Sequence, residues 1–312
     1  MEPVKLISLD ATQMGTQTCA ALLGDRATAK LVNMVPLKNK ADVYSKVAMA
    51  MKARLKSMKT EDCPTIKKLY LNNAKQLFHR SVWKRPTMTI LYGATRTTYA
   101  NHLREDIEVA TGVKLSTSEA RFIGGITEEV LTEVLPAAVL LMQSLTGVVK
   151  TVVRHTDKPF IFTTATGAVF KAAKYKSSTY HKLGVTSGFG LDIKVETGDI
   201  NVKATAKSAA AQLIQSFDAV IAGEIQCEMD RLNIPVLSVF DSWSVPVGYT
   251  STLIEVARAA YIKHLAEDPL KSFYDEAKAR YPILWKHPKL FLKRGNYDIK
   301  SELPKCKHFI GL

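Results

Sequence analysis

The spacing of apolar positions changes along the chain, and each change marks a change in the expected structure. Residues 4–9 form a short apolar run that predicts a strand ending at Asp10. Beyond it, an Ala- and Leu-rich composition, or apolar residues at helical spacing, predicts a series of helices. These helices are expected at residues 18–33, 43–55, 64–78 and 81–91.

In the middle region, the pair Gly124-Gly125 is expected to break the chain before a helix that ends near Val149. The most apolar stretch, residues 134–149, is interrupted by polar residues and is too short to cross a membrane, so we expect a buried helix. Between residues 150 and 205, Val, Thr, Phe, Ile and Lys alternate, which predicts strands and loops with an exposed basic face. The lysines of that face are Lys171, Lys174, Lys176 and Lys182.

The last part of the chain begins with a predicted helix at residues 206–231. Apolar runs on both sides of Asp241 then predict a hairpin with this aspartate in its turn, followed by a helix at residues 251–265. If the first strand pairs with this hairpin, Asp10 and Asp241 come to adjacent strand ends. The expected fold class is therefore α+β, with an antiparallel sheet whose sequence is interrupted by a long, largely helical insertion.

Composition narrows the class of protein. With 312 residues, 46% of them hydrophobic, the chain can bury a large core. Its 43 Lys and Arg residues exceed its 29 Asp and Glu residues, and the resulting charge of +14 favours a polyanionic partner such as nucleic acid. The cysteines form no closely spaced pair, so neither a zinc knuckle nor a disulfide framework is expected. The N-terminal residues lack the basic start and long apolar stretch of a signal peptide.

One predicted helix concentrates candidate chemistry on a single face. Four residues recur there at every fourth position: Arg80, Lys84, Met88 and Tyr92. Arginine binds phosphate oxygens in a bidentate manner and lysine adds a point charge, so this face suits a triphosphate. Met88 and Tyr92 add an apolar wall for a base and a sugar, and Gly93 follows them. Alone, Asp10 and Asp241 are compatible with ordinary turn or helix-capping residues, and a basic pair on a helix is common.

Together, these segments resemble the sequence motifs of the phage-type single-subunit RNA polymerases, a family that includes mitochondrial enzymes. KRPTMTILYG is similar to their motif B, and VFDSWSVPV, with Asp241-Ser242, to their motif C. SLDATQMGTQTCAALLGD is similar to motif A, with Asp10, Gly15 and Gln17 at matching offsets. The segment beginning Asp42-Val43-Tyr44 and the C-terminal tail, residues 295–312, also resemble the family, so the similarity runs through the whole chain in the family's order.

The resemblance implies a right-hand polymerase fold with an antiparallel palm sheet and a largely helical fingers insertion. Residues 1–37 would form the first part of the palm with motif A, and residues 38–205 the fingers, with the motif B helix at about 80–93. Residues 206–266 would complete the palm with motif C, and residues 267–312 would form a C-terminal extension that ends near the active site.

The resemblance also implies two-metal nucleotidyl transfer from ribonucleoside triphosphates to an RNA transcript on a DNA template. Two Mg²⁺ ions would be held by Asp10, Asp241 and the backbone carbonyl of Ala11. Asp10, Asp241, Lys84 and Tyr92 would be the catalytic residues, with Tyr92 at the ribose 2′-hydroxyl. The nucleotide-binding residues implied by the motifs are Arg80, Lys84, Arg85, Met88, Tyr92, Gly93 and Tyr44.

Three features depart from the family's pattern. Phe240 stands where a histidine often precedes the motif C aspartate, which removes a polar neighbour but no metal ligand. Residues 215–221, Gln-Ser-Phe-Asp-Ala-Val-Ile, lack both histidines of the corresponding family segment, so ribose selection would rest more heavily on Tyr92. Pro86 lies inside the motif B helix and is expected to kink it, because proline cannot donate to the carbonyl of Val82.

The family has a long region before motif A, which supplies the thumb and an Asp-x-x-Gly-Arg segment that grips the template. This sequence begins close to Asp10 and lacks that segment. We expect it to be the catalytic C-terminal subunit of a two-chain phage enzyme, working in the cytoplasm of an infected bacterial host with a second polypeptide that supplies the missing region. The alternative is a fragment of a longer enzyme. No membrane partner is expected.

Two other functions fit part of the pattern. Family A DNA polymerases share the helix spacing, but they typically have Phe where Met88 stands, His-Asp-Glu in motif C, and a motif A glutamate that blocks the 2′-hydroxyl. Here motif C has Asp241-Ser242, and no acidic residue follows Asp10 until Asp25. A non-catalytic basic nucleic-acid-binding subunit would explain the charge, but not why both aspartates accompany the helix face that begins at Arg80.

Overall fold

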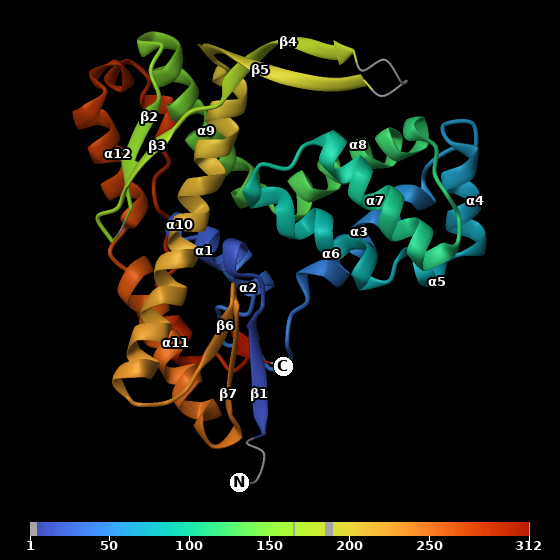
Figure 1. Ribbon diagram of the computed structural model, residues 1–312. Helices are drawn as coiled ribbons and strands as arrows, with labels where there is room; N and C mark the ends of the chain where they lie inside the picture. Colours follow the sequence, from blue (N-terminus) through green and yellow to red (C-terminus); the bar gives the residue numbers. More distant parts are fainter. Residues whose placement is uncertain (1–4, 165, 185–189, 312) are drawn as a thin grey trace.

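The computed structural model describes residues 5–164, 166–184 and 190–311 of the chain (Figure 1). Within these ranges, the side chains of residues 178–184 and 190–194 are not described, so the expected exposure of Lys182 lies outside the described residues. The other three lysines of the expected basic face, Lys171, Lys174 and Lys176, are exposed.

The site is organised by an antiparallel sheet that joins distant parts of the sequence. Its strands, in spatial order among the described residues, are β6 (Leu237–Val239), β7 (Ser242–Pro246), β1 (Leu6–Ala11) and β8 (Ile310–Gly311). In the central strand β1, Asp10 stands opposite Ser242 on one side and Gly311 on the other. The predicted pairing of the first strand with the hairpin around Asp241 is confirmed.

Alternation along the strands gives this sheet one covered face and one open face. Leu9 and Ala11 of β1 and Trp243 and Val245 of β7 are buried. Helix α11 (Thr250–Leu265) contacts β7, and it packs in turn against α10 (Val202–Arg231) and α1 (Met14–Leu23). The side chain of Asp10 belongs to the opposite, exposed set, so it is available to a ligand.

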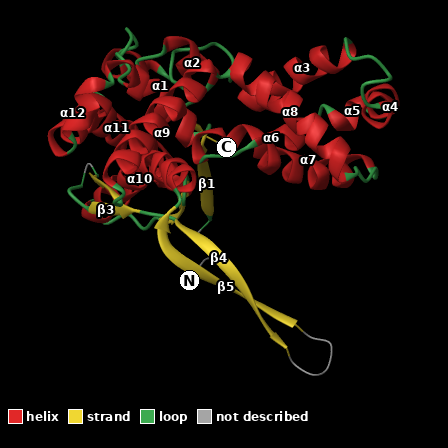
Figure 2. Cartoon of the chain, turned by 90° about the horizontal axis from the view of Figure 1, so that it is seen from above, coloured by secondary structure: helices red, strands yellow, loops and turns green. Residues whose placement is uncertain are grey.

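Residues between β1 and α10 form a largely helical region beside the sheet (Figure 1). It contains α2 (Arg26–Leu31), α3 (Val43–Lys56), α4 (Pro64–Asn72), α5 (Ala74–Leu77), α6 (Arg80–Thr89), α7 (Arg96–Thr111), α8 (Thr117–Val134) and α9 (Pro136–Thr156). Two hairpins follow: β2 (Phe160–Thr163) with β3 (Val169–Ala172), and β4 (Tyr175–Gly184) with β5 (Gly190–Ile200). Figure 2 shows β4 and β5 extending away from the helices.

The C-terminal part returns the chain to the sheet. It includes α12 (Pro269–Arg280) and α13 (Ile299–Glu302), and β8 then pairs with β1. Short 3₁₀ turns occur at Ile90–Tyr92, Val247–Tyr249, Pro282–Lys286, Pro288–Leu290 and Leu303–Lys305. The mixed α+β class expected from the sequence is confirmed, and the described part of the chain is mostly helical.

Several expected helix boundaries were wrong. The single helix predicted at 18–33 is two helices, because Gly24 adopts a left-handed backbone (φ +59°) that ends α1. Gly124 and Gly125 do not break the chain but lie inside α8, where they face Arg96 and Ala100 of α7. The break falls instead at Pro136, where proline begins α9. Helices α7 and α12 were not predicted.

The apolar helix α9 is longer than predicted, since it extends to Thr156 rather than Val149. By length and composition it could cross a membrane, so the expectation that this stretch is too short and too polar was wrong. Eight of its residues are buried, however, and it packs along α10. This is the environment of a core helix, as the sequence predicted.

Candidate active site

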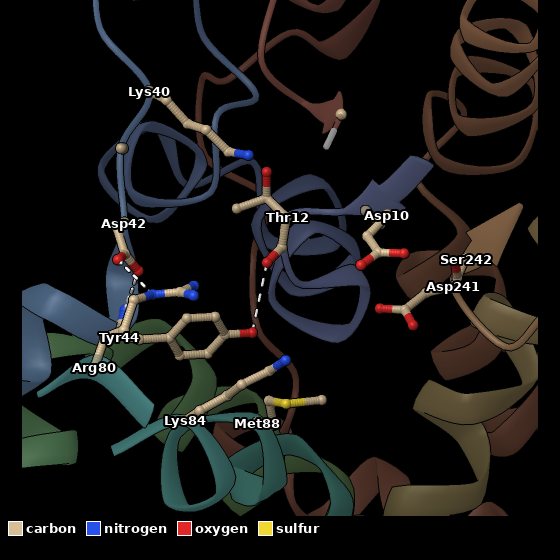
Figure 3. Close-up of a pocket in the computed structure, with 13 residues that line it drawn as sticks. Asp10, Thr12, Lys40, Asp42, Tyr44, Arg80, Lys84, Met88, Asp241 and Ser242 are labelled. Carbon is tan, nitrogen blue, oxygen red and sulfur yellow. Dashed lines mark hydrogen bonds and ion pairs between the residues drawn. The ribbon is translucent and has the colours of Figure 1, made fainter. Parts of the chain in front are cut away.

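The two predicted aspartates lie side by side at the end of the sheet. The strand register places Asp10 opposite Ser242, and the backbone N–H of Ala11 donates to the carbonyl oxygen of Asp241 at 2.9 Å. Their carboxylates face each other across the cavity edge in Figure 3. Burial and the nearby Asp10 charge raise the pKa of Asp241, although Lys84 acts in the opposite direction. The pair is therefore a local excess of negative charge.

A cavity of about 480 Å³ opens in front of this pair. Its walls come from β1, β7, the loop before α3, and α6. The lining residues are Asp10, Ala11, Thr12, Lys40, Ala41, Asp42, Tyr44, Arg80, Lys84, Met88, Asp241, Ser242 and Gly311. A single cavity thus joins the predicted carboxylates to three of the four residues on the predicted helix face.

The cationic wall of the cavity is organised by Asp42, the N-cap residue of α3. Its side chain accepts from the backbone N–H groups of Tyr44 and Ser45, and Arg80 Nε donates to its Oδ2 at 2.9 Å. The guanidinium of Arg80 also lies over the Tyr44 ring, 5.2 Å from its centroid. Lys84 extends toward the aspartates from the next turn of α6 (Figure 3).

A second cavity, of about 500 Å³, adjoins the first and shares Met88 and Asp241 with it. Its other lining residues are Met14, Tyr92, Gln215, Asp218, Ala219, Ala222 and Phe240. Tyr92, the fourth residue of the predicted helix face, therefore belongs to this adjoining space. Its phenol donates to Asp218 Oδ2 at 2.9 Å. Burial and the Asp218 charge raise the pKa of Tyr92, so the phenol keeps its proton at neutral pH.

The motif A residues Gly15 and Gln17 have structural tasks beside the site. A Cβ on Gly15 would lie 2.7 Å from the phenol oxygen of Tyr92, so only glycine leaves room for this ring. Gln17 is buried, and its Nε2 donates to the carbonyl oxygen of Phe309 at 2.7 Å. Gln17 thus secures the C-terminal segment that places β8 beside Asp10.

Two predicted nucleotide-binding residues lie elsewhere. Arg85 pairs with Glu105 and Asp106 of α7, each at 2.9 Å, and is not among the described residues that line the two cavities. Gly93 has a left-handed backbone (φ +80°) and lines a third cavity, of about 550 Å³, which shares no lining residue with the first two. Pro86 lies within α6, which continues to Thr89, and the expected kink stays a prediction.

Sequence reasoning did not assign Asp218 to the site. It was noted only within a segment that lacks the expected histidines. The structure shows it on α10, partly buried at the wall of the second cavity, accepting hydrogen bonds from Tyr92 and from Thr18. Its position midway along a helix gave no local signal, because the partner Tyr92 is 126 positions away in the sequence.

The donor chemistry at the cavity edge fits divalent cations that prefer oxygen ligands. Asp10 and Asp241 offer carboxylate oxygens, and their mutual repulsion would be relieved by positive charge between them. Among the described residues there is no cluster of three or more His, Cys, Asp or Glu side chains. Such ions would complete their coordination with water and substrate phosphates, as Mg²⁺ commonly does.

Comparison with known proteins agrees with this geometry. Residues 4–302 match the model of a family described as DNA-dependent RNA polymerase. The chain is also 25% identical over 304 residues to the DNA-directed RNA polymerase 2A of Nicotiana tabacum, an alignment that covers 94% of this chain and 88% of that protein.

Proposed function

The chain belongs to the phage-type single-subunit family of DNA-dependent RNA polymerases, and we propose that it carries the catalytic centre of such an enzyme. The reaction is template-directed transfer of a ribonucleotide to the 3′-hydroxyl of RNA. The O3′ oxygen attacks the α-phosphorus of the incoming triphosphate, the α–β phosphoanhydride bond breaks, and pyrophosphate leaves with its electron pair. DNA template, RNA transcript and ribonucleoside triphosphates are therefore the expected ligands.

One observation carries this proposal. Asp10 and Asp241 come together only through the sheet, and they face the helix with Arg80 and Lys84 across a single cavity. A turn aspartate or an exposed basic helix would explain either element alone, but neither explains why they share one cavity. A non-catalytic nucleic-acid-binding subunit needs positive charge, and it has no use for two adjacent carboxylates.

Each side chain has a role that follows from its chemistry. Asp10 and Asp241, with the carbonyl of Ala11 as a further candidate, would hold two Mg²⁺ ions. Bound there, the ions would supply activation of the attacking hydroxyl and neutralisation of charge on the leaving pyrophosphate. Lys84 and Arg80 bind the triphosphate oxygens, on which negative charge is concentrated. Met88 separates the triphosphate space from the second cavity, where Tyr92 meets the sugar.

The proposed function also implies that the chain is divided into the parts of a right-hand polymerase. We assign residues 1–37 and 206–266 to the palm, residues 38–205 to the fingers, and residues 267–312 to a C-terminal extension. The return of β8 to Asp10 supports the last assignment. A second polypeptide of a two-chain phage enzyme would supply the thumb, and the host cytoplasm would be the compartment.

Primer extension tests this function without a promoter. A short RNA annealed to a longer DNA template is supplied with Mg²⁺ and ribonucleotides, with the chain alone and then with the product of an adjoining reading frame. The variant Asp241→Asn should abolish extension and leave binding of the hybrid within about twofold, because it removes a metal ligand without changing the cationic surface. Asp230→Asn is the matched control, since this aspartate is exposed at the end of α10.

The outcomes separate the alternatives. Extension by Asp241→Asn at the wild-type rate would refute the metal assignment. Equal use of deoxyribonucleotides by the wild-type chain would restore the DNA polymerase alternative. Hybrid binding without any extension, with or without the second polypeptide, would favour the non-catalytic basic subunit.

A further inference from the structure

The phenol of Tyr92 is held between two groups that the sequence separates widely. Its oxygen lies where a side chain on Gly15 would collide with it, and it donates to Asp218 Oδ2 at 2.9 Å. Asp218 is itself fixed on its other side, because Thr18 donates to Oδ1 at 3.1 Å. The phenol therefore has a fixed position at the wall of the second cavity.

The donors and acceptors of Tyr92 and Asp218 determine which hydrogen bond the phenol can still offer to a ligand. A phenol has a single proton to donate, and its oxygen can also accept. An ionised carboxylate can only accept, so the Tyr92 proton is committed to Asp218. What remains for a ligand in the cavity is the acceptor side of the phenol oxygen. With its proton donated to Asp218, Tyr92 favours a ligand that can donate an O–H group to the phenol oxygen.

We propose that Asp218 is a positioning residue for sugar selection, which acts through Tyr92 by keeping the phenol oxygen an acceptor for the ribose 2′-hydroxyl. This inference rests on the proposed function and deepens it. A ribonucleotide supplies the required donor, whereas a deoxyribonucleotide leaves the phenol oxygen without a partner in a confined space. Losing one such hydrogen bond commonly changes relative affinity by about tenfold or more.

Among the residues of α10 that line the cavity, Asp218 is the one that accepts the hydrogen bond from Tyr92. The residues of this helix that line the cavity are Gln215, Asp218, Ala219 and Ala222. Ala219 and Ala222 have no polar side-chain atom, and Ile221 is buried. Tyr92 is thus oriented by a carboxylate on α10, in a segment that lacks the two histidines of the family pattern.

The test measures the ratio of kcat/KM for UTP to that for dUTP in primer extension. Asp218→Ala should lower this ratio about tenfold or more, because the phenol proton can then turn toward the cavity and the hydroxyl no longer distinguishes the two sugars. Asp218→Asn should retain most of the ratio. Its carboxamide oxygen can accept from Tyr92 while its N–H₂ group donates to the Thr18 hydroxyl, which can accept.

A double variant separates positioning from general damage. In a Tyr92→Phe background, where the hydroxyl is gone, adding Asp218→Ala should not change the ratio further. A merely structural role would instead lower the rates with UTP and dUTP by the same factor and leave the ratio unchanged, which would overturn the proposal. The proposal would also be overturned if Asp218→Ala lowered the UTP-to-dUTP ratio as much in the Tyr92→Phe background as in the wild type. Loss of this ratio in Asp218→Asn would overturn it as well.

A replacement variant and a binding measurement cover the cases in which Asp218→Ala does not fold or no extension is observed. If Asp218→Ala does not fold, Asp218→Leu, which has nearly the same shape as aspartate, replaces it. Competition of UTP and dUTP against a fluorescent ribonucleotide gives the ratio of the two dissociation constants, which should shift in the same direction, and needs no turnover. If the wild type extends RNA but Asp218→Ala leaves the UTP-to-dUTP ratio unchanged, only this inference is contradicted. If the wild type does not extend RNA but Asp218→Ala changes the binding ratio of the two nucleotides, only the proposed function is contradicted.

Discussion

Arg80 and Asp42 form an ion pair that joins two helices of the cavity wall: Nε of Arg80 lies 2.9 Å from Oδ2 of Asp42. Asp42 also caps α3, and the hydrogen bonds from Ser45 and the charge of Arg80 outweigh its partial burial and lower its pKa. Because Nε is occupied, the two terminal nitrogens of Arg80 remain available to a phosphate. The pair thus orients the guanidinium toward the cavity.

The variant Asp42→Asn tests this orientation. The asparagine oxygen can still cap α3, and the pair is half-exposed, so the free energy of unfolding should change by less than about 1 kcal/mol. With Arg80 no longer held by a charge, the KM for the nucleotide should rise about threefold to tenfold, with kcat changed less than twofold. Single-nucleotide addition kinetics and urea unfolding measure the two effects. The control is Glu302→Gln, which breaks the surface ion pair with Arg26. An unchanged KM in Asp42→Asn would contradict the role of Asp42 in orienting Arg80.

The turn before Asp241 contains a conformation that its residue does not favour. Phe240 has a left-handed backbone (φ +54°), and its ring is 90% exposed while it borders the second cavity. A non-glycine residue in this conformation costs about 1 kcal/mol, and an exposed ring recovers little by burial. Such strain beside a site suggests that the ring serves a ligand.

We therefore expect Phe240→Gly to raise the free energy of unfolding by about 1 kcal/mol and, if the ring stacks on a base of the bound nucleic acid, to lower primer extension severalfold. Denaturant titration and the kcat/KM for the primed template are the measurements. Asn233→Gly is the control, because Asn233 has the same φ of +54° in an exposed turn outside the cavities. An unchanged extension rate in Phe240→Gly would leave the exposed ring without a function.

The elements that hold Asp10 and Asp241 were predictable because their signals are local. A short apolar run before Asp10 and a hairpin pattern around Asp241 specify strands, and the register confirms that they pair. The helix face from Arg80 to Met88 was predictable for the same reason, since spacing alone places these residues together.

Other parts of the site depend on contacts that no local pattern encodes. The contact of Asp218 with Tyr92 requires knowing that α10 passes beside Tyr92, and the pairing of Arg85 with Glu105 and Asp106 requires knowing where α7 lies. Helix α7 itself was missed. The pair Gly124-Gly125 was interpreted as a break, although its small size is what lets α7 and α8 approach closely.

This interpretation of Gly124 can be tested against a matched glycine. An alanine Cβ at Gly124 would lie 2.8 Å from the carbonyl oxygen of Arg96 and 3.0 Å from the nitrogen of Ala100, so Gly124→Ala should destabilise by about 1–3 kcal/mol. Gly223 lies in α10 with nothing within 4 Å of its added Cβ, and Gly223→Ala should stabilise by up to about 1 kcal/mol. Thermal or urea unfolding compares them. Equal effects of the two substitutions would mean that helix propensity, not the contact with α7, decides.

The carboxyl of Asp218 is partly buried, and this makes stability depend on pH. Burial, followed by the weaker effect of the nearby Asp241 charge, raises its pKa from 3.8 to about 6, despite the hydrogen bonds from Tyr92 and Thr18. Below about pH 3.8 the group is protonated in both the folded and the unfolded chain and costs nothing. As pH rises through about 6, the folded chain must hold a charge that the unfolded chain carries more easily. The cost at pH 8 is about 2–3 kcal/mol.

Asp218→Asn removes this charge and retains the acceptor for Tyr92. We expect the variant to be more stable than the wild type by about 2 kcal/mol at pH 8, and the difference to shrink as pH falls through 6 toward 4.5. Urea unfolding of both proteins at several pH values gives the difference directly. A difference that stays constant, or that grows as pH falls, would show that Asp218 is not a buried group of raised pKa. If the expected dependence is found, the chain carries a destabilising carboxylate next to Tyr92, a cost consistent with a functional rather than a structural reason for its presence.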